Sequence, residues 1–189
     1  MRKLKLQTQL SLDGFIAGPK GEMDWMVWNW DEALIKYVTE LTEAVDSILL
    51  GRVLAQVFIP HWTEAVTKPE TANAFAHKMV DTPKIVFSKT LEKPEWDNTN
   101  LAKGDLVEEI TQLKKQSGKD IIAYGGSGFV SSLVRNGLID EYHLFINPVV
   151  IGDGMTIFRT VEQKLNLKLV KASPFDCGIV VLCYQPAGK

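Results

Sequence analysis

Residues 124–128, Tyr-Gly-Gly-Ser-Gly, lie between an apolar run and a stretch with helical periodicity. Glycine has no side chain, so the amides that open the following helix stay accessible to an anion. The hydroxyl of Ser127 can cap that helix or donate to a phosphate oxygen. These residue types predict a phosphate-binding loop, with an ordinary tight turn as the alternative interpretation.

Two more segments of this kind follow other apolar runs. Gly51, Arg52 and Val53 come directly after a short aliphatic stretch, and Ser88 and Lys89 come after Lys-Ile-Val-Phe. A guanidinium, an ammonium and a hydroxyl are all donors to phosphate oxygens. Each segment alone is compatible with a solvated loop, but three in one chain predict a ligand that carries several phosphates.

Other phosphate and metal motifs fit poorly. The chain contains no G-x-x-x-x-G-K-[ST] motif, and a dinucleotide fingerprint through Gly126 and Gly128 would have Ser131 in place of its third glycine. His61, His77 and His143 lie far apart without H-x-x-x-H spacing, so no metal site is expected.

The two cysteines predict no disulfide. Cys177 and Cys183 are six residues apart in one apolar stretch, and an extended strand would separate them by about 20 Å. Two buried thiols in a reducing compartment is the favoured interpretation.

Composition bounds the class of protein. With 189 residues and 46% hydrophobic content, the chain is expected to form a single domain over residues 1–189. The net charge of −2 and the scattered lysines and arginines argue against a nucleic-acid partner. No apolar run is long enough for a membrane span and no secretory signal opens the chain, so we expect a cytoplasmic protein without membrane contact.

The elements that must position these segments alternate in type. Hydrophobic periodicity predicts helices and strands in alternation through most of the chain and then strand upon strand. Expected strands are 3–10, 47–51, 84–88, 120–124, 140–146, 164–172 and 178–184; expected helices are 31–45, 70–80, 105–116, 127–136 and one that starts at 52; residues 92–100 are expected to be a loop. This pattern predicts an α/β sandwich with a mostly parallel central sheet and antiparallel C-terminal strands. In such sheets ligands bind at the carboxyl ends of strands, where the three segments would meet.

The ordered motifs SLDGFIAG, LLGR, KIVFS, YGGSGFVSSLV and GLIDEYHLFINPVVIGDG resemble the dihydrofolate-reductase-like superfamily over residues 3–185. The chain is most similar to the C-terminal reductase domain of the bifunctional riboflavin-biosynthesis deaminase-reductase. The resemblance implies a dihydrofolate-reductase-like three-layer sandwich that binds NADPH across the strand ends. It also implies a homodimer formed through the C-terminal strands.

The resemblance implies cofactor contacts at four segments. These are Ile16 and Ala17 beside the nicotinamide, Gly51, Arg52 and Val53 at the adenosine-side phosphates, Ser88 and Lys89 near the adenine and 2′-phosphate, and Gly125, Gly126, Ser127, Gly128 and Phe129 at the pyrophosphate. The residues themselves favour NADPH over NADH, because Arg52 and Lys89 suit an extra phosphate, where an NAD site usually offers an acid.

Fewer residues are candidates for proton delivery or substrate contact than for cofactor contact. Asp13 is the candidate for proton delivery, with an Asp-Gly turn as the alternative. Substrate contacts are expected from Asp24, Trp25, Asp31 and Tyr124, although Trp25 also suits a core and Asp31 a helix cap. Dihydrofolate reductases carry a pterin-binding acid near Asp31, and the riboflavin enzymes commonly have a glutamate where this chain has Tyr124.

Two functions therefore remain open at this stage. The first is an NADPH-dependent reductase of a small heterocyclic substrate, either aminouracil reductase-like or dihydrofolate reductase-like. The second is a nucleotide-binding module of the same fold that has lost its chemistry.

Overall fold

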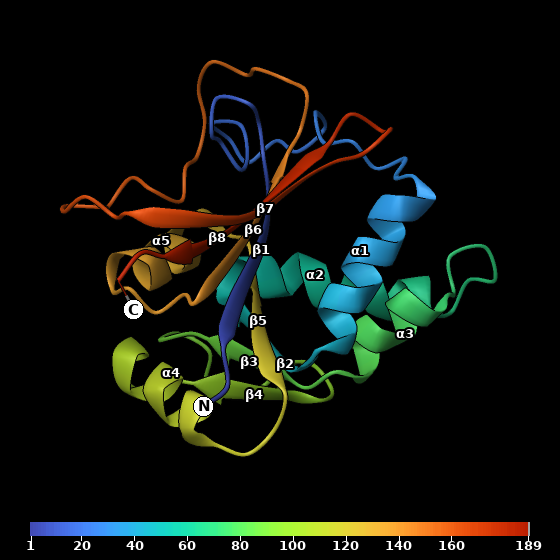
Figure 1. Ribbon diagram of the computed structural model, residues 1–189. Coiled ribbons are helices and arrows are strands. Elements are labelled where there is room, and N and C mark those ends of the chain that lie inside the picture. The colour runs from blue at the N-terminus through green and yellow to red at the C-terminus, as the bar shows by residue number, and fades with distance from the viewer. Residues whose placement is uncertain (189) are drawn as a thin grey trace.

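The computed structural model describes residues 1–188. Eight strands and five helices alternate along most of this part of the chain, as Figure 1 shows. In chain order they are β1 (Leu4–Leu10), α1 (Glu32–Glu43), β2 (Val45–Gly51), α2 (Arg52–Ala65), α3 (Ala74–Asp81), β3 (Lys84–Phe87), β4 (Thr99–Ala102), α4 (Leu106–Lys115), β5 (Asp120–Tyr124), α5 (Ser127–Arg135), β6 (Glu141–Ile146), β7 (Leu167–Pro174) and β8 (Val180–Pro186).

All eight strands form one sheet in the order β4-β3-β2-β5-β1-β6-β8-β7. The six strands from β4 to β6 are parallel, whereas β8 runs antiparallel to both β6 and β7. The expected fold class, a mostly parallel central sheet with antiparallel C-terminal strands, is confirmed. Because the six strands are parallel, their carboxyl ends share one edge of the sheet.

Helices cover both faces of the sheet (Figure 1). Leu4, Leu6 and Ile121 point into a core that α4 and α5 cover. Ile122, next to Ile121 on β5, and its cross-strand partner Ile48 on β2 point into the opposite core, which α1, α2 and α3 cover. The middle residues of β2 and β5 are apolar on both faces, because helices cover both faces of these strands.

One strand was missed. Residues 92–100 were expected to form a loop, but β4 begins at Thr99 and pairs with β3. It has four residues and pairs on one side only, because it is an outermost strand of the sheet. Its sequence, Thr-Asn-Leu-Ala, has too little alternation to signal a strand, so pairing with β3 decides the conformation.

Among residues 1–188, no helix is both long enough and apolar enough to cross a membrane.

Candidate functional site

The carboxyl ends of β3, β2 and β5 lie next to one another. These strands are neighbours in the sheet, Gly51 pairs with Phe87, and Leu49 pairs with Ala123. The three candidate phosphate segments therefore begin at nearly the same level on one edge. The first and the last of these segments, which begin at Gly51 and Gly125, are more than seventy residues apart in the chain, and the structure brings them together.

Two helices start at this edge without a side-chain cap. The N-cap residues are Gly51 for α2 and Gly126 for α5, and neither provides an acceptor for the first amides. In contrast, Asp31, Asn73 and Asp105 cap α1, α3 and α4 with their side chains. Uncapped amides and the positive end of the helix dipole favour an anion at the first turns of α2 and α5.

The glycine loop is open above α5. A Cβ at Gly128 would meet no atom within 4 Å outside its chain neighbours and its own helix backbone, and one at Gly126 would meet only the Leu54 side chain, at 3.6 Å. Gly126 has φ of +106°, a conformation that other residues rarely adopt. The nearest atom to a Cβ at Gly125 is the Thr8 hydroxyl oxygen, at 3.4 Å. No neighbouring side chain therefore fills the space over the first turn of α5.

Phe129 fixes the spacing of the three strand ends. Its ring stacks on Phe87 at the end of β3, with 5.0 Å between the centroids. A Cβ at Gly51 would lie 2.7 Å from the Cβ of Phe129, so only glycine allows this close approach of α5 to β2. The Phe129 side chain thus packs among the strand ends, and only its backbone amide belongs to the open first turn of α5.

The two cations stand at the same edge. Arg52 is half-buried in the first turn of α2, and Lys89 is exposed just beyond β3. Within residues 1–188 no acidic side chain forms a salt bridge with either. Val53 is exposed, whereas the Ser88 hydroxyl accepts hydrogen bonds from the amides of residues 90 and 91 and so shapes the turn.

The loop after β1 reaches α5 through Met155. Ile16 donates its amide to the Met155 carbonyl at 2.8 Å, and Met155 donates its amide to Ala17 at 2.9 Å. The Ser127 hydroxyl in turn contacts the Met155 sulfur at 3.7 Å. Ile16 and Ala17 are buried, so the pair lies beside the start of α5 with its side chains in the core.

Asp13 links two loops. Its carboxylate accepts hydrogen bonds from the Ser11 hydroxyl at 2.6 Å and from the amides of Gly152 at 2.8 Å and Ile151 at 3.3 Å. These bonds, that of Ser11 first, lower the pKa of Asp13 below its ordinary value. An exposed aspartate whose carboxylate is ionised and accepts three hydrogen bonds is a poor proton donor at neutral pH. The geometry favours a role in positioning the loops that flank Ile16 and Met155.

We therefore expect Asp13→Asn to lower Tm at pH 7, because all three partners are donors and the new amide group cannot accept from each of them. The pKa is lower in the folded protein, so this stabilisation is present above about pH 4 and is lost as the pH falls further. Melting curves of both proteins between pH 7 and pH 3 should converge at the acid end. Asp24→Asn, at an exposed aspartate nearby, is the control and should leave Tm unchanged at both ends. If Asp13→Asn melts like the wild type at pH 7, Asp13 does not hold the loops.

The expected substrate contacts differ in how far their polar atoms are already engaged. Asp24 is exposed, and Trp25 is half-buried with its Nε1 donating to the Glu22 carbonyl at 3.2 Å. Asp31 caps α1 through the Leu34 amide and accepts a second bond from the Cys177 amide at 3.0 Å.

Tyr124 does not lie where a substrate contact was expected. Its side chain is buried with Phe58 beneath α2, at 5.1 Å between ring centroids, and its hydroxyl contacts the sulfur of Met79. Side chains alternate along β5, and the position before the glycine loop turns into this core. A substrate at the strand ends therefore meets the glycines after Tyr124 and not its ring.

Asn147 is a residue that sequence reasoning missed. It follows β6 and is fully buried, and its side chain accepts from the Val27 amide at 2.9 Å and donates to Gln9 Oε1 at 2.8 Å. It also donates toward the carbonyls of Leu10 and Phe145. These bonds attach the tryptophan-rich segment 25–30 to the ends of β1 and β6. The available signal was a polar residue directly after a central apolar strand.

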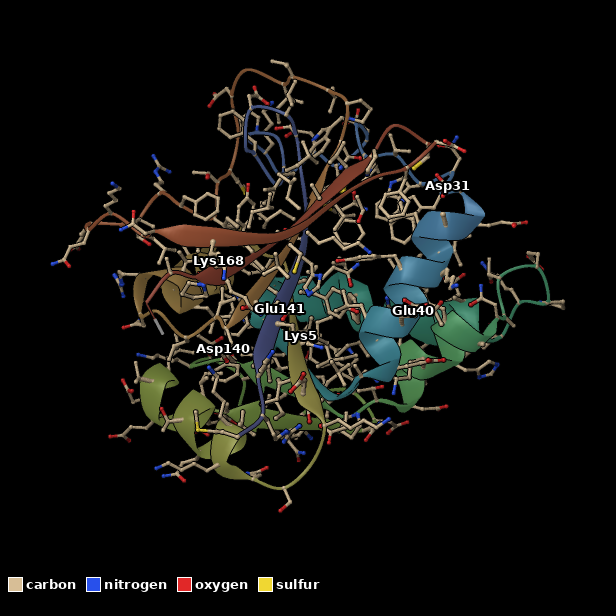
Figure 2. All side chains as sticks on the ribbon, viewed as in Figure 1. Lys5, Asp31, Glu40, Asp140, Glu141 and Lys168 are labelled. Carbon is tan, nitrogen blue, oxygen red and sulfur yellow. The ribbon has the colours of Figure 1, made fainter. Side chains whose placement is uncertain are left out.

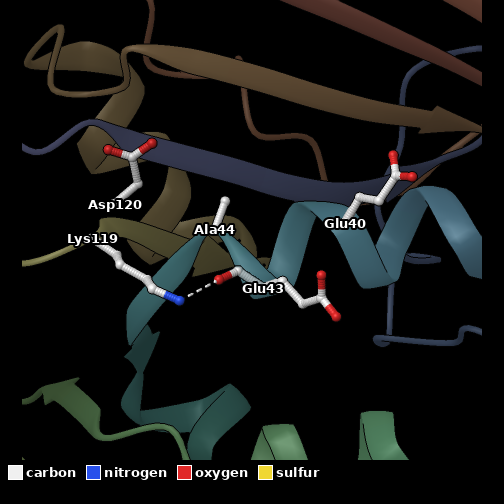
Figure 3. Close-up of a pocket in the computed structure, with 5 residues that line it drawn as sticks. All are labelled: Glu40, Glu43, Ala44, Lys119 and Asp120. Atoms are coloured by element: carbon white, nitrogen blue, oxygen red, sulfur yellow. Dashed lines mark hydrogen bonds between the residues drawn. The ribbon is translucent and has the colours of Figure 1, made fainter.

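A surface depression of about 680 Å³ lies elsewhere, at the amino ends of β2 and β5 (Figure 3). Glu40, Glu43, Ala44, Lys119 and Asp120 line it. Lys119 donates to the Glu43 carbonyl at 2.9 Å, and the acidic side chains outnumber the lysine. This depression is open and does not suit a phosphate, so the candidate site remains the opposite edge of the sheet.

Comparisons with known proteins agree with this fold. The family model described as the RibD C-terminal domain matches residues 2–181. The chain is 35% identical over 188 residues to the uncharacterized protein YyaP of Bacillus subtilis, covering 97% of this chain and 95% of that protein. A putative riboflavin biosynthesis protein from Shewanella has a TM-score of 0.74 at 22% identity, with 99% of each chain covered. Dihydrofolate reductase from Enterococcus faecalis, solved with NADP(H), has a TM-score of 0.63 at 15% identity, covering 97% of this chain and 96% of that one.

Proposed function

Because this chain belongs to the RibD C-terminal domain family, we propose that it is an NADPH-dependent reductase of a small heterocyclic substrate. One observation carries the proposal. Two uncapped helix N-termini, an open glycine loop and two unpaired cations meet at the adjacent ends of β3, β2 and β5. That donor set suits a ligand with a diphosphate and a further phosphate, as NADPH has.

In this proposal the amides of residues 127–129 hold the pyrophosphate, and Arg52 at the start of α2 holds the adenosine-side phosphates. Lys89 at the end of β3 holds the 2′-phosphate. Bound NADPH would supply the hydride. The loop that contains Ile16 and Ala17, fastened through Met155 to the start of α5, aligns and shields the nicotinamide end.

Lys89 gives the test of cofactor preference. Lys89→Gln should raise the Kd of NADPH by about tenfold and that of NADH by less than about twofold, since only NADPH presents a 2′-phosphate to the ammonium. The Kd values come from quenching of tryptophan fluorescence at one fixed salt concentration. Lys93→Gln, on the same exposed loop, carries the same change in charge and should leave both values unaltered. Equal losses for the two cofactors, or comparable wild-type turnover with NADH, would contradict the preference for NADPH.

The second candidate function is a nucleotide-binding module without turnover. The residues expected to contact a substrate favour it. Tyr124 is in the core and Asp31 is engaged by two amides, so neither offers a free polar group to a substrate. Oxidation of NADPH with dihydrofolate or an aminouracil would support the reductase. Binding of NADPH without turnover on a broad set of heterocycles would support the module.

The proposal extends to a cytoplasmic homodimer. Strand β7 is the edge strand at the end of the sheet opposite β4, and its Leu169 and Val170 are 49% and 52% exposed. An exposed edge strand with apolar side chains is suited to pairing with a second copy. Both cysteines are unpaired, as in proteins of reducing compartments. Light scattering should give twice the mass of the chain, and Val170→Lys should give the mass of one chain.

A further inference from the structure

Three side chains with metal-binding atoms meet beneath α1, away from the candidate cofactor site. The carboxylate of Glu141, the imidazole of His143 and the thiol of Cys183 have ligand atoms that all lie within 4.8 Å of one another. His143 and Cys183 are each 6% exposed. Figure 2 shows Glu141 on β6 beside Lys5 of β1, in the middle of the sheet.

The sheet register creates this cluster. His143 on β6 is paired directly with Cys183 on antiparallel β8, so both side chains project from the same face. Glu141 is two residues before His143 on the same strand and points to that face as well. The sequence spacing of histidines therefore gave no indication of the cluster, because its members come together only through strand pairing.

Neighbouring groups hold two of the three ligands in place. Tyr37 of α1 has its hydroxyl 2.6 Å from His143 Nδ1, and Gln185 Nε2 donates to Glu141 Oε2 at 3.2 Å. The other two atoms, His143 Nε2 and Glu141 Oε1, form a hydrogen bond with each other at 2.8 Å, which an ion between them would replace. Outer contacts of this kind orient the ligands of metal sites, leaving the inner atoms to bind the ion.

Gln7 is a separate indication of a ligand at this place. It pairs with His143 across β1 and β6, and its side chain is only 7% exposed. Its Oε1 is buried and has no hydrogen-bond partner among residues 1–188. A buried acceptor without a donor is costly. A metal-bound water would be a donor to it.

We infer that Glu141, His143 and Cys183 bind one divalent transition-metal ion, with Zn²⁺ as the ion that best fits the donors. Carboxylate oxygen, imidazole nitrogen and thiolate sulfur are the three ligand types of tetrahedral zinc, and a water completes the fourth position. On binding, the thiol of Cys183 loses its proton to the solvent and a sulfur–metal bond forms without a change of oxidation state.

The charges around the cluster balance in the bound form. Lys3 Nζ lies 3.7 Å from Glu141 Oε2, and Lys5 is paired with Asp120 at 3.2 Å. Lys171 is paired with Cys183 across β7 and β8, and its Nζ lies 6.0 Å from the centre of the Tyr37 ring. A divalent ion with one thiolate and one carboxylate has no net charge, so it adds no repulsion against these lysines.

The ion would hold the antiparallel strands to the parallel sheet. Its ligands join β6 to β8, and the contact of Tyr37 with His143 links α1 to them. His143 is three residues before the end of β6, which separates the cluster from the strand ends by roughly 10 Å. This site does not depend on the proposed reductase function.

Cobalt titration of the full chain, stripped with a chelator, tests the inference. Co²⁺ bound by a thiolate gives a charge-transfer absorption band, and Zn²⁺ should displace it. We expect one Co²⁺ per chain, and a rise in Tm of about 5 °C or more when free Zn²⁺ is about 100-fold above its Kd.

Three variants separate this site from others. Cys183→Ser and His143→Gln should each abolish the band and the rise in Tm, whereas Cys177→Ser, at the other free cysteine, should keep both. Because a ligand variant can itself lower stability, the rise in Tm is compared with and without Zn²⁺ for each protein. A wild-type chain without the band, or a band that persists in Cys183→Ser, would overturn the inference.

Discussion

Gly128→Asp should lower the affinity for NADPH by about 100-fold while the protein melts at the same temperature or higher. A carboxylate at this position would lie in the first turn of α5, next to the proposed pyrophosphate site, and we take a separation of about 5 Å for the Coulomb energy. At an effective dielectric constant of about 20 the repulsion amounts to roughly 3 kcal/mol. The same carboxylate interacts favourably with the helix dipole, and replacing a helical glycine is itself stabilising. Affinity and stability therefore change in opposite directions.

Gly128→Asn is the matched control, because it has nearly the same shape without the charge. It should keep most of the affinity, since Gly128 is exposed and a Cβ there would meet no neighbouring side chain within 4 Å. Gly126 is less suitable for this test. Its φ of +106° means that any other residue strains the loop, so a loss of binding would not separate charge from distortion. If Gly128→Asp binds NADPH like the wild type, the phosphate does not sit on α5.

Asn147→Ala should destabilise the protein by about 2–4 kcal/mol and lower kcat/KM at least tenfold. The change leaves the partly buried Val27 amide and Gln9 Oε1 without their partner. The segment with Trp25, Trp28 and Trp30 would then detach from the ends of β1 and β6. Chemical denaturation measures the loss of stability, and a red shift of tryptophan emission in the native state reports release of the segment.

The control for Asn147 is another asparagine that makes an exposed hydrogen bond. Asn136 donates to the Ser132 carbonyl at 2.8 Å at the end of α5, so Asn136→Ala should cost less than about 1 kcal/mol. It should leave tryptophan emission unchanged. An Asn147→Ala protein with native emission and native stability would show that segment 25–30 is held by other contacts.

The fold could be predicted from the sequence because its signals are local. Alternation in residues 3–10 and the amphipathic pattern of residues 105–116 each indicate one element, and both are present as β1 and α4. The order of helices and strands then limits the topology. The edge strand β4 lacked such a signal, since its conformation depends on pairing with Lys84–Phe87.

The candidate site was only partly predictable, for a physical reason. The glycine loop at 125–128 could be proposed from the sequence as a phosphate site, because its open backbone depends on properties that the residue type determines. The roles of Asp13 and Tyr124 could not be predicted from their residue types. Whether a carboxylate is free or a ring is buried depends on residues far along the chain, such as Gly152 and Phe58. Asn147 is a similar case, because its partners come from two other segments.

The central claim is that the amides at the ends of β2, β3 and β5 bind a single dinucleotide. Titration of the ¹⁵N-labelled protein with NADPH, followed by backbone NMR, tests it most directly. The account predicts that the largest shifts occur at residues 51–54, 88–91 and 125–129, together and with one Kd. Shifts confined to the depression around Glu43 and Lys119, or no shifts at any concentration of NADPH, would contradict it.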